Sequence, residues 1–153
     1  MSASFFWLGF VMEATVKWHD NNTFIGRSGS GHAVVFDGNK DDSTAPSPME
    51  MVLMAAGACS SVDVVSILKK SRQQVLDCEV KLSAERADTV PKVFTKLHLH
   101  FAVTGVNLSE KQVERAVQLS ADKYCSVSIM LSGSVAVTHS FSVIAAELTP
   151  AAE

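Results

Sequence analysis

The sequence SPMEMVLMAAGACSSVDVVSILKKSR, residues 47–72, decides how this chain folds, because it predicts one long helix. Ser47 is a favourable N-cap, and Pro48 suits the first helical position. Glu50 completes an S-x-x-E capping box with Ser47. Basic residues in the last predicted turn complement the negative end of the helix dipole. Both ends of the helix are therefore marked in the sequence.

The predicted helix is apolar on nearly every side, as residues 51–58 illustrate. A helix of this kind is buried rather than laid on a surface. Glu50, Asp63 and several serines interrupt the run of ~20 apolar residues that a bilayer requires. We therefore expect the central helix of a soluble protein, with no membrane partner. The small residues 55–58 would allow a second helix to approach closely.

Length and composition indicate one domain with an ample core, since the chain has 153 residues and is 47% hydrophobic. The net charge of −3 gives no electrostatic footprint for nucleic acid. Residues 1–11 are apolar but lack the basic start and cleavage site of a secretion signal, so we expect an N-terminal extension. Three cysteines without a signal favour a reducing compartment, which we take to be the cytoplasm.

Alternating apolar and polar residues predict strands at 13–18, 78–86 and 93–103. Turn residues around 23–26 and 32–36 predict a hairpin or meander there, and 135–144 is the last predicted strand. The two central strands, 78–86 and 93–103, should pair antiparallel, with Val93 among the inward side chains. A second capping box, Ser109 to Gln112, begins a helix that places Cys125 at or near its end. This order predicts an α+β domain over residues 12–146, followed by a frayed tail at 147–153.

The predicted long helix needs cover on both sides, and a chain of this length supplies two small sheets at most. A homodimer whose two long helices lie together between sheets would bury it better. We therefore expect a homodimer.

Cys59 and Cys125 are the residues on which we base a chemical hypothesis. A thiolate that attacks a peroxide becomes a sulfenic acid, and a second thiol can condense with it to a disulfide. Sequence spacing does not show whether the two sulfurs meet. The alternative is that both cysteines are small residues of the core without a chemical role. Cys78 falls on the apolar face of a predicted strand, which favours a structural role.

Two motifs, PSPMEMVLMAAGAC ending at Cys59 and KYCSVS around Cys125, resemble the cysteine motifs of the OsmC/Ohr family of osmotically induced and organic hydroperoxide resistance proteins. The resemblance is closest to the YhfA-like branch and extends over residues 12–146. It implies an OsmC-like fold and an intertwined homodimer, with long helices wrapped by sheets and sites at the subunit interface. It also implies that Cys59 attacks the peroxide, that Cys125 resolves it, and that a dithiol or a lipoylated protein is the reductant. We expect no cofactor.

The resemblance further implies an assisting Arg and an assisting Glu. Arg27 is the only Arg before the long helix, and beside Cys59 it would lower the thiol pKa and hold a peroxide oxygen. A solvated residue in a Gly/Ser-rich turn is the alternative for Arg27. Met49 stands where the hydroperoxide-resistance branch has its Glu, so the next residue, Glu50, is either catalytic or only a cap. Ser126 replaces the Pro that commonly follows the second cysteine.

Other polar residues bear on this hypothesis. Asp63 lies one turn after Cys59 on the same helix face, where a carboxylate raises the thiol pKa unless it is paired. The spacing of the cysteines matches no zinc pattern. His98 and His100 lie on a polar strand face, whereas the last strand places His139 on its apolar side, so we expect no metal site.

Two functions remain open on the sequence alone. The first is a thiol-dependent peroxidase that reduces organic hydroperoxides to alcohols, with apolar neighbours such as Met54 and Val62 favouring a lipid or alkyl peroxide. The second is a non-catalytic dimer that binds an apolar ligand beside the long helix, with the cysteines as redox sensor or packing. A low Cys59 pKa with multiple turnovers would favour the peroxidase.

Overall fold

The computed structural model describes residues 11–146, so the expected tail and all but the last residue of the expected extension lie outside the described residues. The chain divides after Met51 into two compact units, and each is described by itself. The first holds β1 (Ala14–Asp20), β2 (Thr23–Ser28), β3 (Ala33–Asp37) and the first turn of α1 (Pro48–Lys70). The second holds the rest of α1 and all later elements. Each predicted strand before the long helix has its counterpart here.

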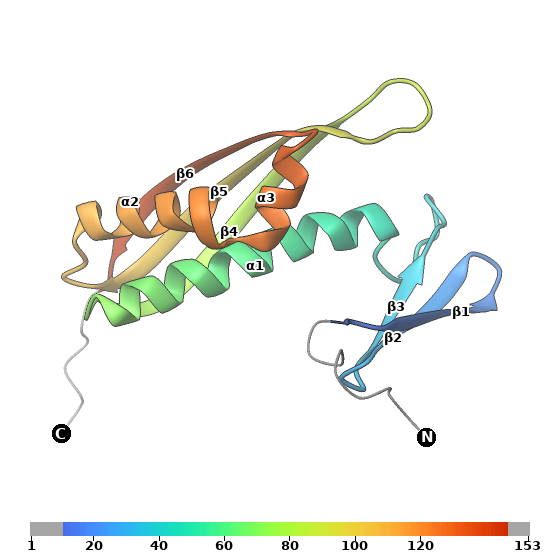
Figure 1. Ribbon diagram of the computed structural model, residues 1–153, viewed down its shortest axis with the longest axis horizontal. Helices are drawn as coiled ribbons and strands as arrows, with labels where there is room; N and C mark the ends of the chain where they lie inside the picture. Colours follow the sequence, from blue (N-terminus) through green and yellow to red (C-terminus); the bar gives the residue numbers. More distant parts are fainter. Residues whose placement is uncertain (1–10, 147–153) are drawn as a thin grey trace, which may run out of the picture. The chain divides into compact units, whose positions relative to one another are not determined.

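The first unit is an antiparallel meander in the order β1-β2-β3 (Figure 1). Asp37, at the end of β3, is a buried charged residue and fixes the loop that follows. Its carboxylate accepts hydrogen bonds from the amides of Asn39 at 2.8 Å and Thr44 at 2.9 Å, and from the Thr44 hydroxyl at 3.1 Å. These bonds hold the pKa of Asp37 below its usual value, with the Thr44 amide the largest cause.

The capping box that begins α1 is confirmed. The Ser47 amide and hydroxyl donate to Glu50 Oε2 at 2.8 and 2.7 Å, and the Glu50 amide donates to Ser47 Oγ at 3.3 Å. The hydrogen bonds from Ser47 lower the pKa of Glu50. By length and composition α1 is apolar enough to cross a membrane, a criterion that core helices of soluble proteins also meet.

The second unit is built on a sheet in the order β4-β5-β6, from β4 (Gln74–Arg86), β5 (Phe94–Val106) and β6 (Ala136–Ala145). β4 pairs antiparallel with β5, as predicted, and β6 pairs parallel with β5. The inward prediction for Val93 is wrong, because the register shifts after Glu85 and places Phe94 inside instead. The inner face of β5 supplies the fully or almost fully buried Leu97, Leu99, Phe101 and Val103.

Three helices, α1, α2 (Glu110–Leu119) and α3 (Ser126–Ser132), lie on one face of this sheet (Figure 1). Gly57 lets α1 approach β4 closely, because a Cβ at this position would lie 2.7 Å from Leu82 Cδ1. Among the described residues, the buried part of the small-residue patch thus contacts the sheet rather than a second helix. Ala55 and Ala58 of the same patch are exposed.

The second predicted helix differs from the structure in two ways. Ser109 makes no side-chain cap, so its predicted capping box is wrong; its amide instead donates to Gln73 Oε1 at 2.8 Å. The helix also changes its type before it reaches Cys125. α2 ends at Leu119, a π-helical turn, η1 (Ser120–Tyr124), follows, and Cys125 becomes the N-cap of α3, a helix too short to show periodicity in the sequence.

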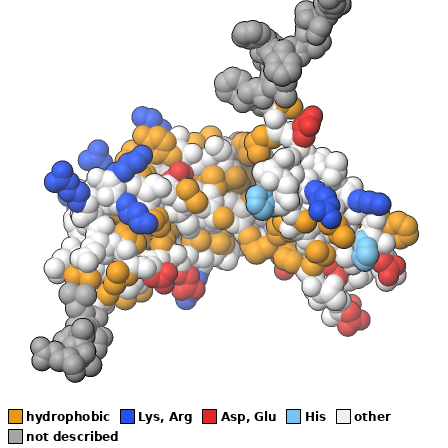
Figure 2. Space-filling model, turned by 90° about the horizontal axis from the view of Figure 1, so that it is seen from below, with side chains coloured by type: hydrophobic (Ala, Val, Ile, Leu, Met, Phe, Trp, Pro, Cys, Tyr) orange, Lys and Arg blue, Asp and Glu red, His pale blue; other side chains and the backbone are white. Residues whose placement is uncertain are grey.

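The second unit leaves part of α1 uncovered. Val52, Met54 and Val62 are 36, 46 and 66% exposed. Figure 2 shows exposed hydrophobic side chains interspersed with polar and charged ones. The α+β class with two sheets and a long helix is confirmed, while cover on the second side of α1 stays a prediction.

Candidate dithiol site

The structure brings Cys59 and Cys125 together within the second unit. Cys59 lies in the middle of α1, and Cys125 precedes α3. The two sulfurs and a carboxylate oxygen of Asp63 all lie within 4.8 Å of one another. Both thiols are free. This is the arrangement that two-thiol chemistry requires and that sequence spacing could not show.

Cys125 is fully buried and receives most of the hydrogen bonds at the site. Ser60 Oγ donates to its sulfur at 3.0 Å, and the Ser128 amide donates at 3.4 Å. Burial alone would raise the pKa of Cys125, but the hydrogen bonds from Ser128, Ser60 and Cys59 outweigh it and lower the pKa. These bonds stabilise the negative charge of a thiolate on Cys125.

Cys59 is only partly buried, and its environment is less favourable to a thiolate. A hydrogen bond from the Val127 backbone lowers the pKa of Cys59, but desolvation, the interaction with Cys125 and the negative charge of Asp63 together raise it. The expected effect of Asp63 is therefore present. Cys125 is therefore the more acidic of the two thiols, since its pKa is lowered while that of Cys59 is raised.

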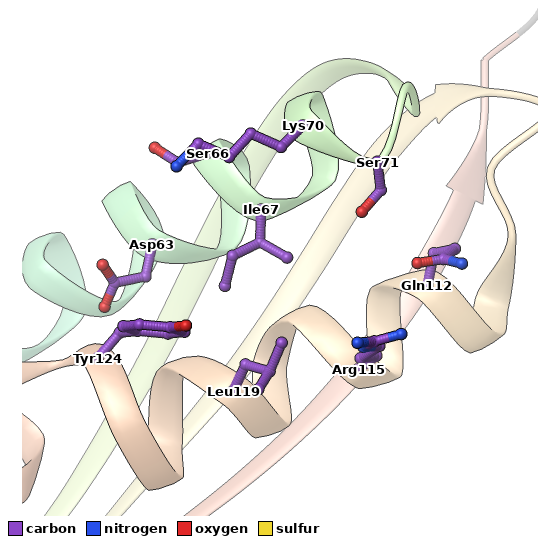
Figure 3. A pocket seen from close by; sticks show the side chains of 9 residues that line it. All are labelled: Asp63, Ser66, Ile67, Lys70, Ser71, Gln112, Arg115, Leu119 and Tyr124. Atoms are coloured by element: carbon purple, nitrogen blue, oxygen red, sulfur yellow. The ribbon is translucent and has the colours of Figure 1, made fainter.

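Asp63 connects the sulfurs to a pocket of about 570 Å³ between α1 and α2 (Figure 3). Its Oδ2 accepts from Ser120 Oγ at 3.2 Å. In Figure 3, Asp63 and Tyr124 lie at one end of the pocket and Ser71 and Gln112 at the other. The complete lining is mixed polar, charged and apolar: Asp63, Ser66, Ile67, Lys70, Ser71, Gln112, Arg115, Leu119 and Tyr124.

The two assisting residues inferred from the resemblance belong to the first unit. Arg27 is an exposed residue of β2, and the carboxylate of Glu50 is engaged by Ser47. Their participation at the thiols therefore stays a prediction. Cys78 is half-buried on β4, and burial followed by the charge of Asp77 raises its pKa.

The histidines of β5 and β6 fall on two faces of the sheet. His98 and His100 hydrogen-bond hydroxyl groups of β6, including Ser140 at 2.8 Å from each ring. His139 stacks on Phe101, with ring centroids 6.3 Å apart, on the inner face. Burial, with His98 next in size, lowers the pKa of His139.

Sequence reasoning missed Ser60 and Ser120 as parts of the site. Both are almost fully buried, although serine is usually exposed. The available signal was a hydroxyl residue directly after Cys59 within an apolar helix. Ser120 gave a weaker signal, because it occupied an inward position of the predicted second helix.

Comparison with known proteins identifies the family of this chain. The model of OsmC-like proteins matches residues 39–140, which include both cysteines of the site. The chain is 59% identical to Protein YhfA of Escherichia coli K12 over 135 residues, 88% of this chain and all of the relative. It therefore belongs to the OsmC-like family.

Solved structures support the same assignment. A hypothetical protein from Aquifex aeolicus is 32% identical with a TM-score of 0.81, over 90% of this chain and 98% of its own. An organic hydroperoxide resistance protein OsmC from Legionella pneumophila is 19% identical with a TM-score of 0.67, over 88% of this chain and 98% of its own. At 19% identity, the Legionella pneumophila protein shows only that the fold is shared.

Proposed function

We propose that this protein is a thiol-dependent peroxidase that reduces organic hydroperoxides to alcohols. The observation that carries the proposal is the meeting of the Cys59 and Cys125 sulfurs beside one carboxylate. Membership of the OsmC-like family, which shares its fold with an organic hydroperoxide resistance protein, supports the substrate class. Cys59 makes the first attack, since Cys125 is completely buried and Cys59 is not.

The first step is the attack of Cys59 on the peroxide. Cys59 loses its proton and, as the thiolate, attacks the terminal oxygen of the hydroperoxide. The O–O bond breaks, and the alkoxide takes up a proton and leaves as the alcohol. Cys59 is now a sulfenic acid.

The second step closes the disulfide. The Cys125 thiolate attacks the Cys59 sulfur and expels hydroxide, which takes up a proton and becomes water. The two sulfurs have together supplied the two electrons that reduced the O–O bond. A dithiol or a lipoylated protein then reduces the disulfide and is itself oxidised.

Arg27 is the assisting residue in this proposal. Arg27 offers a positive charge that would offset Asp63, lower the pKa of Cys59 and hold a peroxide oxygen. The hydrogen bonds between Glu50 and Ser47 favour a structural role for Glu50 as the cap of α1.

A homodimer completes the proposal. The exposed Val52, Met54 and Val62 on α1 support an interface there, because a helix with this much exposed apolar surface gains stability when a second copy covers it. We place the protein in the cytoplasm, where reduced thiols persist. The charged Lys70 and Arg115 in the pocket give no specific support to the alternative of a purely apolar ligand.

The proposal is tested on the reduced full-length protein with one equivalent of cumene hydroperoxide. We expect a Cys59–Cys125 disulfide in peptide mapping and one equivalent of alcohol. Cys59→Ser should abolish peroxide consumption. Cys125→Ser should keep the first attack and stop at the sulfenic acid with one equivalent, and a second equivalent should over-oxidise Cys59, since no thiol traps the sulfenic acid.

The matched control is Cys78→Ser, which removes the third cysteine and should consume peroxide like the parent. Equal consumption by the parent and by Cys59→Ser would overturn the proposal. Unchanged free thiols in the parent after exposure would do the same.

A further inference from the structure

The carboxylate of Asp63 lies where its negative charge disfavours the thiolate form that a nucleophilic cysteine needs. It lies within 4.8 Å of both sulfurs, where its charge opposes that of a thiolate. Among residues 11–146 the only ion pair joins Lys96 and Glu85, so Asp63 has no ion-pair partner in that range. Two thiols and a carboxylate gathered in this way would repel one another when ionised, and a bound cation would remove that repulsion.

The three groups have the chemistry and the placement of metal ligands. Cys59 and Asp63 are four residues apart on one face of α1, a spacing that directs two ligands to one point. Cys125 comes from a second element, the N-cap of α3. In a tetrahedral zinc site the ligand atoms lie about 3.5–4 Å apart, since Zn–S bonds are about 2.3 Å long. Small side-chain adjustments from separations within 4.8 Å reach this geometry.

Buried hydroxyl groups already orient these ligands. Ser120 Oγ donates to Asp63 Oδ2 at 3.2 Å, and Ser60 Oγ donates to Cys125 Sγ at 3.0 Å. Such outer hydrogen bonds fix the ligands of metal sites and tune their affinity. Asp63 also lines the pocket between α1 and α2, so one of the three ligands borders an open space.

We propose that the reduced protein binds one zinc-like divalent cation per chain through Cys59 Sγ, Cys125 Sγ and a carboxylate oxygen of Asp63. Two thiolates favour soft or borderline metals over Mg²⁺ or Ca²⁺. Binding forms two metal–sulfur bonds and releases the proton of each thiol that is protonated beforehand. The bound ion occupies both sulfurs, so the loaded protein forms no Cys59–Cys125 disulfide. The cysteines fail the sequence patterns of zinc sites because the third ligand is a carboxylate.

The test uses reduced, metal-free, full-length protein titrated with Co²⁺ as a spectroscopic probe and with Zn²⁺ against a chromophoric chelator. We expect one ion per chain, a sulfur-to-cobalt charge-transfer band and the strong visible bands of tetrahedral Co²⁺. Asp63→Asn should lower Zn²⁺ affinity by at least about tenfold, as loss of even an outer-shell partner commonly does. Cys59→Ser and Cys125→Ser should each remove the charge-transfer band or reduce it by half.

Two controls match the ligands in residue type. Cys78→Ser removes a thiol from β4, and Asp122→Asn removes an exposed carboxylate from η1. Both should bind Zn²⁺ like the parent. Far-UV circular dichroism of every variant separates lost binding from lost fold. Parent-like Zn²⁺ affinity in Asp63→Asn would reduce the site to a bare dithiol and overturn the proposal, as would binding that survives both cysteine substitutions.

The metal site and the peroxidase can fail separately. Metal binding without peroxide consumption would overturn the proposed function and leave this inference standing. Peroxide consumption without metal binding would do the reverse. With both present, a stoichiometric amount of Zn²⁺ should suppress disulfide formation and a chelator should restore it.

Discussion

Strands β1 and β5, from the two sheets of this protein, have similar alternating sequences but very different burial. In the second unit, Leu99 and Phe101 of β5 are fully buried beneath α1, α2 and α3. In the first unit, Val16 and Trp18 of β1 are 64 and 63% exposed. An alternating pattern therefore identifies a strand and its apolar face, while burial of that face depends on what covers it. The first sheet has its own polar anchor at Asp37, and the second has an apolar core.

Removal of an aromatic side chain from each sheet should give the largest contrast. Phe101→Ala should lower the free energy of unfolding by about 3–5 kcal/mol, because it leaves a cavity in a fully buried site. Trp18→Ala should cost less than about 1 kcal/mol at low protein concentration, since Trp18 is largely exposed. Urea unfolding followed by far-UV circular dichroism measures both. Similar losses in the two variants at low concentration would contradict the difference in burial.

Asp37 allows the polar anchor of the first unit to be tested by pH. Its folded pKa is lowered from 3.8, so the carboxylate stabilises the fold above that pH. This contribution is lost as the pH falls from 3.8 through the lower folded pKa. Asp37→Asn should therefore be less stable than the parent at pH 7, and the two proteins should converge in acid.

The measurement is the unfolding midpoint in urea at several pH values between neutral and acid. The control is Asp41→Asn, which changes an exposed carboxylate in the same loop. A difference between Asp37→Asn and the parent that stays constant down to the lowest pH would show that the charge of Asp37 is not what holds the loop.

Much of this fold could be predicted because the signals are local. The capping box of Ser47 and Glu50 fixed the start of α1, and alternation together with turn residues located the strands to within a few residues. The end of the second helix could not be predicted, since the change to a π-helical turn at Ser120 depends on contacts with α1 such as the Ser120–Asp63 hydrogen bond. A seven-residue helix such as α3 leaves no periodic pattern.

The dithiol site likewise has parts that the sequence predicted and parts that it could not predict. Cys59 and Cys125 were identified from their motifs, and the effect of Asp63 on Cys59 followed from helical spacing. The relative acidity of the two thiols could not be predicted, because it depends on Ser60 from α1 and Ser128 from α3 reaching the same sulfur. Contacts between residues far apart in sequence decide which thiol is the stronger acid.

Ser60→Ala tests those contacts in the second unit and should have a moderate effect. It removes a hydrogen bond to Cys125, so the pKa of Cys125 should rise and its alkylation should need a higher pH. Loss of the bond should also cost about 1 kcal/mol of stability. Alkylation rates of each cysteine as a function of pH, read by peptide mapping, provide the measurement. Ser61→Ala is the neighbouring control, and an unchanged Cys125 profile in Ser60→Ala would argue against the hydrogen bond.

Glu50→Gln should have the smallest effect on stability and on peroxide consumption. This variant tests whether the first unit contributes to the chemistry of the second. Gln at this position can still accept from the Ser47 amide, so the capping box should survive with little change in the unfolding midpoint. If Glu50 only caps α1, peroxide consumption by Glu50→Gln should equal that of the parent. Ser47→Ala supplies the opposite control, because it weakens the cap by about 1 kcal/mol while keeping the carboxylate. A parent-like midpoint with a large loss of peroxide consumption in Glu50→Gln would instead make Glu50 part of the site, and would mean that the dithiol of the second unit works only with a group from the first.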